Sequence, residues 1–393
     1  MLKDPLSIRN TYKMLSISCH NSVKMSAAGS GKTYDICKNA LEMAKSGKKV
    51  LITTYTNRGA ESVRKEIKTQ NEGVLHPFVV VRTWYSFLLA DMIKPYQRYL
   101  TGRIGGIKTF DYSQTFGYIN YAKAGTKAKY ITPEKKVRSN EGASLVCLLN
   151  QLSGGKVIHR LAEIYHVIYF DEIQDLAGDD ITIIKLLIDS SIIVVCCGDN
   201  KQATFSTHNA KKNKNMTGKN IWVFFEELEK KGLVEVERNL CSRRFNRQIC
   251  CFANSVFPFG DPITTSMSIE TMHDGVFLID ASNVGEYMST YSPQVLRYDK
   301  NTDTYGYRPV NFGACKGETF DRVLIVPNGP FVKLITKGIP LCAPEKYYVA
   351  VTRPKFSIAI VLAKLPDIVS GYEKVMITCG KKQIRGLKYI AMN

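Results

Sequence analysis

Short apolar and β-branched runs alternate, along most of the chain, with stretches that carry apolar residues at helical spacing. This alternation is typical of parallel sheets covered by helices. We therefore expect an α/β protein with two lobes and a boundary near residues 219–231. The strands of the first lobe are predicted at 49–54, 78–82, 167–170 and 192–197, and those of the second at 233–237, 276–280, 294–298, 322–326 and 357–363.

Residues 94–160 interrupt the first series of strands and differ from it in composition. The 67 residues hold twelve Lys or Arg against three acidic residues, together with eight Tyr or Phe. Interleaved cations and rings suit a nucleic-acid single strand, because the cations contact phosphates and the rings stack on bases. A small inserted domain with a tyrosine core and solvated lysines would have the same composition, and the sequence leaves both interpretations open.

The overall composition limits the class of protein and of partner. The 393 residues include 54 Lys and Arg against 35 Asp and Glu, which gives a formal net charge of +19. With 45% hydrophobic and 23% charged residues the chain is typical of globular proteins, and its positive charge favours a polyanion such as nucleic acid or an acidic membrane surface. No apolar run approaches the ~18 residues of a membrane span, so we expect a cytoplasmic protein, not a membrane protein, with reduced cysteines.

A phosphate-binding loop is predicted directly before a helix that begins near Tyr34. Its glycines allow backbone N–H groups to surround phosphate oxygens, while Lys32 would reach the β and γ phosphates and the Thr33 hydroxyl would bind Mg²⁺. A glycine-rich helix N-terminus without a ligand is the alternative. The motif comprises Ser26, Ala27, Ala28, Gly29, Ser30, Gly31, Lys32 and Thr33, with Ser26 in place of the usual first glycine.

Two acidic residues follow the buried strand predicted at 167–170, at the sheet edge where α/β proteins bind ligands. Asp171 is expected to hold Mg²⁺ through water, and Glu172 to polarise an attacking water. An acidic cap on the following helix is the structural alternative, which the upstream phosphate-binding loop makes the minor one. Together the two motifs predict ATP as substrate and Mg²⁺ as cofactor.

Further motifs occur in a fixed order along both lobes. They lie at residues 56–60, 83–87, 171–175, 198–202, 244–254, 316–321 and 348–353. In sequence and order they resemble the motifs of superfamily 1 helicases of the UvrD/Rep type. The resemblance implies two RecA-like P-loop NTPase lobes with parallel sheets, the first formed by 1–93 and 161–225 and the second by 226–393, with 94–160 as a small basic insert.

The resemblance also implies roles for individual residues. Gln202 would sense the γ phosphate from the first lobe, and Arg244 and Arg353 would approach it from the second, since guanidinium groups meet phosphate oxygens bidentately. With Glu172 these form the expected catalytic set, and Gly317 and Glu318 complete the expected nucleotide site. Residues expected to contact the nucleic-acid strand are Thr56, Asn57, Arg58, Thr83, Trp84, Tyr85, Phe205 and Thr319. For Trp84 the alternative is an aromatic core residue at the start of a helix.

The chain departs from the family pattern at several positions. Thr207 stands where an aromatic residue is usual, so Phe205 or His208 would have to substitute, and Gly313 replaces a DNA-contacting histidine. Glu318 precedes rather than follows Thr319. The first glutamine is Gln70, so the usual adenine-reading glutamine before the phosphate-binding loop is missing and other nucleoside triphosphates could serve. Only 56 residues, 255–310, separate the fourth and fifth motifs, so the large inserted domain of bigger relatives is missing or rudimentary.

The resemblance implies an enzyme that hydrolyses ATP and moves along single-stranded DNA as a translocase or helicase, from 3′ to 5′. RNA is not excluded as the substrate, because no motif is identified as contacting a 2′-hydroxyl. The alternative function is a nucleotide-gated nucleic-acid sensor or scaffold, which would regulate a partner such as a nuclease, for example in phage defence, without processive unwinding.

Overall fold

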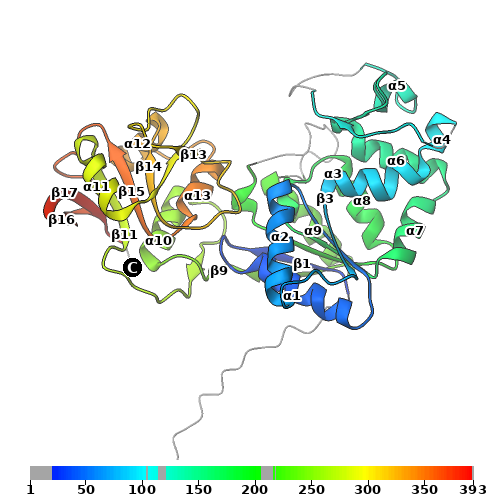
Figure 1. Cartoon of the computed structure of the whole chain (residues 1–393), viewed down its shortest axis with the longest axis horizontal. Helices are drawn as coiled ribbons and strands as arrows, with labels where there is room; N and C mark the ends of the chain where they lie inside the picture. Colours follow the sequence, from blue (N-terminus) through cyan, green and yellow to red (C-terminus); the bar gives the residue numbers. More distant parts are fainter. Residues whose placement is uncertain (1–19, 103–104, 114–120, 205–215, 217, 392–393) are drawn as a thin grey trace, which may run out of the picture.

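The computed structural model describes residues 20–102, 105–113, 121–204, 216 and 218–391. The chain forms two lobes side by side, each built on a mainly parallel sheet; Figure 1 shows the first in blue to green and the second in yellow to red. The predicted α/β fold with two RecA-like lobes is thereby confirmed. In the described part of the chain, no helix is both long and apolar enough to cross a membrane.

The first lobe contains a six-stranded parallel sheet with the order β3-β2-β6-β7-β1-β8. Four of its strands lie within one residue of the predicted positions. The strand that leads into the phosphate-binding loop was not predicted, because it has only two apolar residues, Val23 and Met25, and no continuous apolar run. The strands are β1 (Ser22–Ser26), β2 (Val50–Thr54), β3 (Val79–Thr83), β6 (Val167–Phe170), β7 (Ile193–Gly198) and β8 (Glu235–Asn239).

Helices cover both faces of this sheet. On one face, α1 (Lys32–Lys45) buries a stripe that includes Ile36, Ala40 and Ala44, which recur at helical spacing, and it packs beside α2 (Asn57–Gln70) in one apolar cluster. The opposite face carries a larger apolar core. The helices that contribute to that core are α3 (Trp84–Phe87), α6 (Gly142–Leu152), α7 (Lys156–Ile164), α8 (Asp179–Ile188) and α9 (Ile221–Lys230).

One strand that was predicted for the second lobe belongs to the first. The run at 233–237 was expected to open the second series, but β8 pairs with β1 at the edge of the first sheet. The first lobe therefore extends to Asn239, beyond the predicted end at residue 225. Local apolar pattern identifies a strand, whereas the sheet that it joins depends on tertiary contacts.

The segment 94–160 shares its core with the first lobe. Phe110, Tyr130 and Leu145 are buried in the same cluster as Val23 and Leu51 of the sheet. Other rings of the segment face solvent: Tyr112 is 62% exposed and Tyr121 is 89% exposed. The interpretation as a tyrosine core thus applies to Tyr130, whereas nucleic-acid binding by the exposed rings stays a prediction. Besides α6 and α7, the segment contains α4 (Arg98–Thr101), β4 (Phe110–Asp111), α5 (Lys127–Tyr130) and β5 (Val137–Arg138).

The second lobe has a seven-stranded sheet with the order β13-β12-β14-β15-β11-β17-β16, in which a C-terminal antiparallel hairpin extends five parallel strands. Its strands are β11 (Gly275–Asp280), β12 (Gln294–Arg297), β13 (Pro309–Asn311), β14 (Phe320–Val326), β15 (Pro354–Leu362), β16 (Tyr372–Cys379) and β17 (Lys382–Tyr389). Its helices are α10 (Arg247–Val256), α11 (Val284–Tyr291), α12 (Gly329–Lys337) and α13 (Glu345–Val351), and a short ladder joins β9 (Cys241–Ser242) to β10 (Thr264–Thr265).

Candidate nucleotide and nucleic-acid sites

The phosphate-binding loop lies at the carboxyl end of β1 and touches the second lobe. Gly29 and Gly31 adopt φ values of +74° and +95°, which favour glycine. A Cβ on Gly29 would lie 2.5 Å from the Cβ of Arg244, so only glycine allows this approach. The Lys32 ammonium donates to the carbonyl oxygen of Ala27 at 3.0 Å. The loop thus presents its backbone and Lys32 at a boundary between lobes.

Thr33 and Asp171 come together as predicted. The Thr33 hydroxyl donates to Asp171 Oδ2 at 3.1 Å. Burial and the neighbouring Glu172 raise the pKa of Asp171 to about 6. A cation beside Asp171 would therefore stabilise its ionised carboxylate. A hydroxyl beside one carboxylate, with room for phosphate oxygens and water, is a donor set that suits Mg²⁺. The residues present therefore fit the implied ion.

Glu172 has an unusual backbone conformation. Its φ of +61° lies in the left-handed region, which is costly for a residue with a side chain and is often found at functional sites. Gln174 holds its carboxylate through a hydrogen bond and also accepts from the backbone N–H of Asp199 at 3.1 Å. The turn that follows β6 thus directs the Glu172 carboxylate and links it to the turn that follows β7.

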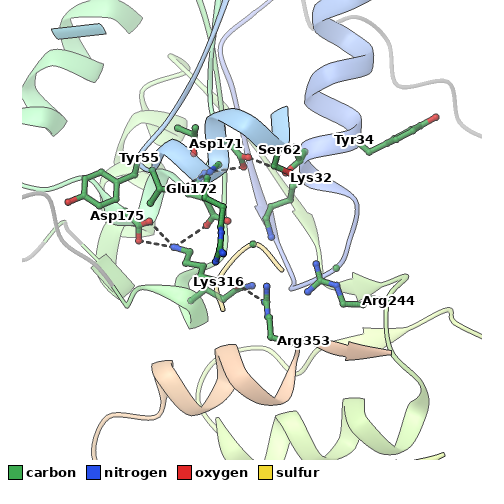
Figure 2. Close-up of a pocket in the computed structure, with 18 of the residues that line it drawn as sticks. Lys32, Tyr34, Tyr55, Ser62, Asp171, Glu172, Asp175, Arg244, Lys316 and Arg353 are labelled. Carbon is green, nitrogen blue, oxygen red and sulfur yellow. Dashed lines mark hydrogen bonds and ion pairs between the residues drawn. The ribbon is translucent and has the colours of Figure 1, made fainter. Parts of the chain in front are cut away.

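Lys316 of the second lobe inserts into this acidic turn (Figure 2). Its ammonium lies 2.7 Å from Asp175 Oδ2 and 3.3 Å from Glu172 Oε2. Burial opposes the charge of Lys316, but Asp175 and Glu172 outweigh burial and raise the pKa of Lys316. In turn, burial raises the pKa of Glu172, while Lys316 and Lys32 overcome that effect and lower it to about 2. Sequence analysis selected the adjacent Gly317 and Glu318 and missed Lys316, although its place in the same motif was a usable signal.

Arginines of the second lobe meet the predicted γ-phosphate sensor of the first. Arg353 is 2% exposed and donates from Nη2 to Gln202 Oε1 at 3.0 Å. Gln202 in turn donates to Asp199 at 2.7 Å. Arg244 donates to the carbonyl oxygen of Thr352 at 3.0 Å, and burial, followed by the charge of Arg353, lowers its pKa. Two adjacent guanidinium groups, that of Arg353 buried and that of Arg244 partly buried, form a site that an anion would stabilise.

These groups line one pocket of about 480 Å³ between the lobes (Figure 2). Its walls include Gly29, Lys32, Thr33, Asp171, Glu172, Gln202, Arg244, Gly317 and Arg353. Ser26, Ala27, Ala28 and Ser30 belong to the same loop but are buried rather than part of the pocket wall. Ala27 and Ala28 pack into the apolar core of the second lobe. The pocket also includes Tyr34 and Arg243, which sequence analysis did not select.

Residues 122–219 match the family model of the UvrD/REP helicase N-terminal domain. This segment of the first lobe is therefore similar to the N-terminal domain of UvrD/REP helicases. No curated protein sequence matches the chain. Among solved structures, arterivirus nonstructural protein 10 (helicase) with DNA matches at 13% identity and a TM-score of 0.43, over 87% of this chain and 60% of the other.

Three residues predicted to contact the nucleic-acid strand lie at the start of α2. The Thr56 side chain caps the helix by accepting from the backbone N–H of Gly59 at 3.0 Å, and Asn57 is exposed. Arg58 instead reaches the second lobe, where it lies 2.8 Å from Glu318 Oε1 and donates to the carbonyl oxygen of Ala314. In this structure Arg58 and Glu318 therefore join the two lobes at the pocket.

The prediction that Trp84 contacts the nucleic-acid strand is wrong for this structure. Its side chain is only 1% exposed, and its indole N–H donates to Asp180 Oδ1 at 2.8 Å, so it cannot stack on a sugar or base in this structure. The core alternative describes it better, because a large ring gains most by burial when its N–H finds a partner. Thr83 caps α3 by accepting from the N–H of Ser86, and Tyr85 lies against Tyr55 at a ring distance of 6.1 Å.

The remaining predicted strand contacts have different outcomes. Thr319 is exposed at the start of β14, next to Glu318. Phe205, with Thr207 and His208, lies outside the described residues. Tyr55 was not predicted, although it directly precedes Thr56 and lines the nucleotide pocket. Apart from Thr319, the described groups lie at or next to the turns that follow β2 and β3.

Proposed function

We propose that this chain is an ATP-dependent translocase of single-stranded DNA with helicase activity, moving from 3′ to 5′. The observation that supports this most is the meeting of Arg244 and Arg353, from the second lobe, with Lys32 and the acidic turn of the first lobe in one pocket. Such a composite pocket couples nucleotide binding to the relative position of the lobes. The direction of movement comes from family analogy alone.

In the proposed reaction, Lys32 exchanges the Ala27 carbonyl oxygen for phosphate oxygens of ATP. Mg²⁺ held by Thr33 and Asp171 would neutralise phosphate charge. Glu172 orients the attacking water and accepts its proton, for which its carboxylate must be ionised. Arg244 and Arg353 neutralise the charge that develops on the γ phosphate, a contribution worth roughly 10³–10⁵ in kcat for comparable arginines.

Gln202 is placed to report the state of the γ phosphate. Its side chain joins Asp199 of the first lobe to Arg353 of the second. A γ phosphate between these groups would replace the direct contact with bridged contacts, and loss of phosphate after hydrolysis would restore it. Alternation between the two arrangements moves one lobe against the other, which supplies the translocation step.

We propose that the nucleic-acid strand crosses the turns that follow the β-strands β2 and β3. Exposed Asn57 and Thr56, whose side chain caps α2, offer hydrogen bonds to phosphate. Tyr55 and Tyr85 offer rings on which bases can stack. Beyond them, Tyr112 packs edge-on against Tyr85 at a ring distance of 5.5 Å. The aromatic surface therefore continues into the basic segment 94–160, in agreement with a single-strand path.

ATP hydrolysis with and without oligo(dT) tests the proposal. The wild-type rate is expected to rise on addition of the strand, Lys32→Ala to abolish turnover, and Glu172→Gln to retain nucleotide binding while turnover is lost. Displacement of a labelled strand from duplexes with a 3′ or a 5′ tail then tests unwinding and polarity. An ATPase that is indifferent to nucleic acid contradicts the proposal. Stimulated hydrolysis without displacement would instead favour the sensor alternative.

A further inference from the structure

Trp84 contacts the acidic turn of the nucleotide site at both of its ends. Its ring packs on Phe170, the residue directly before Asp171, at a ring distance of 5.8 Å. Its indole N–H donates to Asp180, which begins the helix after the turn, at 2.8 Å. The second oxygen of Asp180 accepts from the backbone N–H of Ala177 at 3.1 Å. One indole therefore holds the two ends of the turn that carries Asp171, Glu172 and Asp175.

The neighbours of Trp84 are less buried than Trp84 itself. Thr83 and Tyr85 are partly exposed, and both belong to the proposed strand surface. Tyr85 is hydrogen bonded to Tyr55, which lines the nucleotide pocket. Burial raises the pKa of Tyr55, and the charges of Asp175 and Asp180 raise it further, which shows how near these carboxylates are. Three consecutive residues thus connect the proposed strand surface with the acidic turn.

We propose that Trp84 is a positioning residue that transmits occupancy of the strand surface at Thr83 and Tyr85 to the acidic turn at 171–175. A strand that shifts segment 83–85 moves the indole, and the indole carries Asp180 and Phe170 with it because both contacts are buried and directional. The carboxylates of Asp171 and Glu172 then adopt the arrangement that hydrolyses ATP. This inference depends on the proposed function, since it requires a nucleic-acid strand that stimulates hydrolysis.

Trp84→Phe removes the N–H and keeps a ring at the buried position. We expect the ratio of strand-stimulated to basal kcat to fall about two- to thirtyfold, the range of coupling energies that single residues carry. The KM for ATP and the affinity for fluorescent oligo(dT) should change less than kcat, because Thr83, Tyr85 and the phosphate-binding loop are unaltered. Asp180→Asn, which retains an oxygen as acceptor for the indole, should lose less of the stimulation than Trp84→Phe.

The chain provides a matched control in its other tryptophan. Trp222 is also buried, at 5% exposure in the first lobe, but its indole N–H has no hydrogen-bond partner among the described residues. Trp222→Phe should therefore leave the stimulation ratio unchanged. Because the chain has only two tryptophans, this variant also leaves Trp84 as the single indole fluorophore. Its emission should shift when oligo(dT) saturates the protein, although the buried ring cannot touch the strand.

The outcomes separate this inference from the proposed function. A wild-type ATPase without strand stimulation contradicts the proposed function. A stimulated wild type with an equally stimulated Trp84→Phe variant overturns only the role of Trp84. If Trp84→Phe does not fold, the Trp222→Phe protein decides the question: an emission shift on strand binding supports the coupling, and unchanged emission at saturation overturns it.

Discussion

The ammonium of Lys316 lies 2.7 Å from the carboxylate of Asp175 and joins the second lobe to the acidic turn of the first. Lys316 also lies 3.3 Å from Glu172, the proposed general base. Its positive charge stabilises ionised Glu172 and makes that carboxylate a weaker proton acceptor. A contact between lobes thus sets the protonation of the group on which hydrolysis would depend. Any relative movement of the lobes that shifts Lys316 changes the pKa of Glu172.

Lys316→Met should shift the acidic limb of the pH–rate profile upward. In the wild type, Lys316 is the main group that lowers the pKa of Glu172, to about 2, against the effect of burial. Without the lysine, burial dominates and Glu172 becomes ionised only at higher pH. Strand-stimulated kcat measured from pH 5 to 9 should therefore fall more steeply towards pH 5 in the variant than in the wild type, whose Glu172 stays ionised throughout this range.

Lys355→Ala is the control for this substitution. Lys355 belongs to the same lobe and pairs with Asp321 at 2.9 Å, but both side chains are exposed. An exposed pair contributes little, so the control should keep the wild-type profile. Superimposable profiles for Lys316→Met and wild type would show that Glu172 does not titrate in the reaction.

The affinity for Mg²⁺ should depend on pH through Asp171. Burial and Glu172 raise the pKa of this carboxylate to about 6, so below that pH a proton occupies the proposed ligand. Ion binding must then displace the proton, and the apparent affinity should fall about tenfold per unit of pH below 6. Titration of Mg²⁺ into the ADP complex, followed by calorimetry at pH 5, 6 and 7.5, measures the effect.

Asp171→Asn tests whether this dependence originates at Asp171. The variant should bind Mg²⁺ weakly at every pH and lack the steep loss below pH 6, because its amide does not titrate in this range. A wild type whose Mg²⁺ affinity is flat from pH 5 to 7.5 would contradict the assignment of Asp171 as the ion-binding carboxylate.

Tyr34 should bind the base of the nucleotide without selecting it. The side chain is 50% exposed and lines the pocket, with its ring directed away from Lys32 (Figure 2), and Arg243 lines the same pocket. Stacking on rings is worth roughly 1–3 kcal/mol and accepts any base. We therefore expect ATP and GTP to be hydrolysed with kcat/KM values within about tenfold, and Tyr34→Ala to raise KM for both at least about fivefold.

Tyr305→Ala provides the comparison for Tyr34→Ala. Tyr305 is 41% exposed in the second lobe and is not part of the pocket wall, so its removal should leave KM unchanged. A KM effect of Tyr34→Ala on ATP alone would indicate specific adenine recognition and would disprove the stacking explanation.

The local parts of the site could be predicted from sequence, because their chemistry is encoded in short motifs. Thr33 and Asp171 are 138 residues apart. The phosphate-binding motif identifies Thr33, and Asp171 directly follows a predicted strand at the sheet edge where α/β proteins bind ligands. The contacts between lobes were harder to predict from the sequence. Lys316 was missed because only the assembled lobes reveal its partners, and β8 was assigned to the wrong lobe because an apolar run does not specify its sheet.

Trp84 illustrates a second limit of the sequence. The same Trp-Tyr pair fits a nucleic-acid-binding surface or a core, and the structure buries Trp84 while it leaves Tyr85 partly exposed. Asp180, the partner that decides for Trp84, lies 96 residues away and carries no motif signal. Burial of a polar ring needs a specific acceptor, and the acceptor is visible only in three dimensions.

The second lobe should be sensitive to acid because of a buried histidine. His273 is 7% exposed, its ring stacks between Phe277 and Tyr291, and its Nε2 is hydrogen bonded to the Tyr287 hydroxyl at 2.8 Å. Burial, with Arg322 and Lys388, lowers its pKa from 6.5 to about 3. Between these values the unfolded chain binds a proton that the folded chain does not. The stabilisation is therefore complete above pH 6.5 and is lost as the pH falls towards 3.

Urea unfolding of wild type and His273→Phe at pH 7.5 and 5.0 measures this contribution. His273 should account for about 2 kcal/mol of the stability that the wild type loses between pH 6.5 and 5.0, at about 1.4 kcal/mol per pH unit, and the variant should lack that part. The comparison uses the change with pH, so any packing cost of the substitution cancels. His159→Gln is the control, since the His159 side chain is 75% exposed and its variant should keep the wild-type dependence. Equal losses in wild type and His273→Phe would show that His273 is not the group responsible.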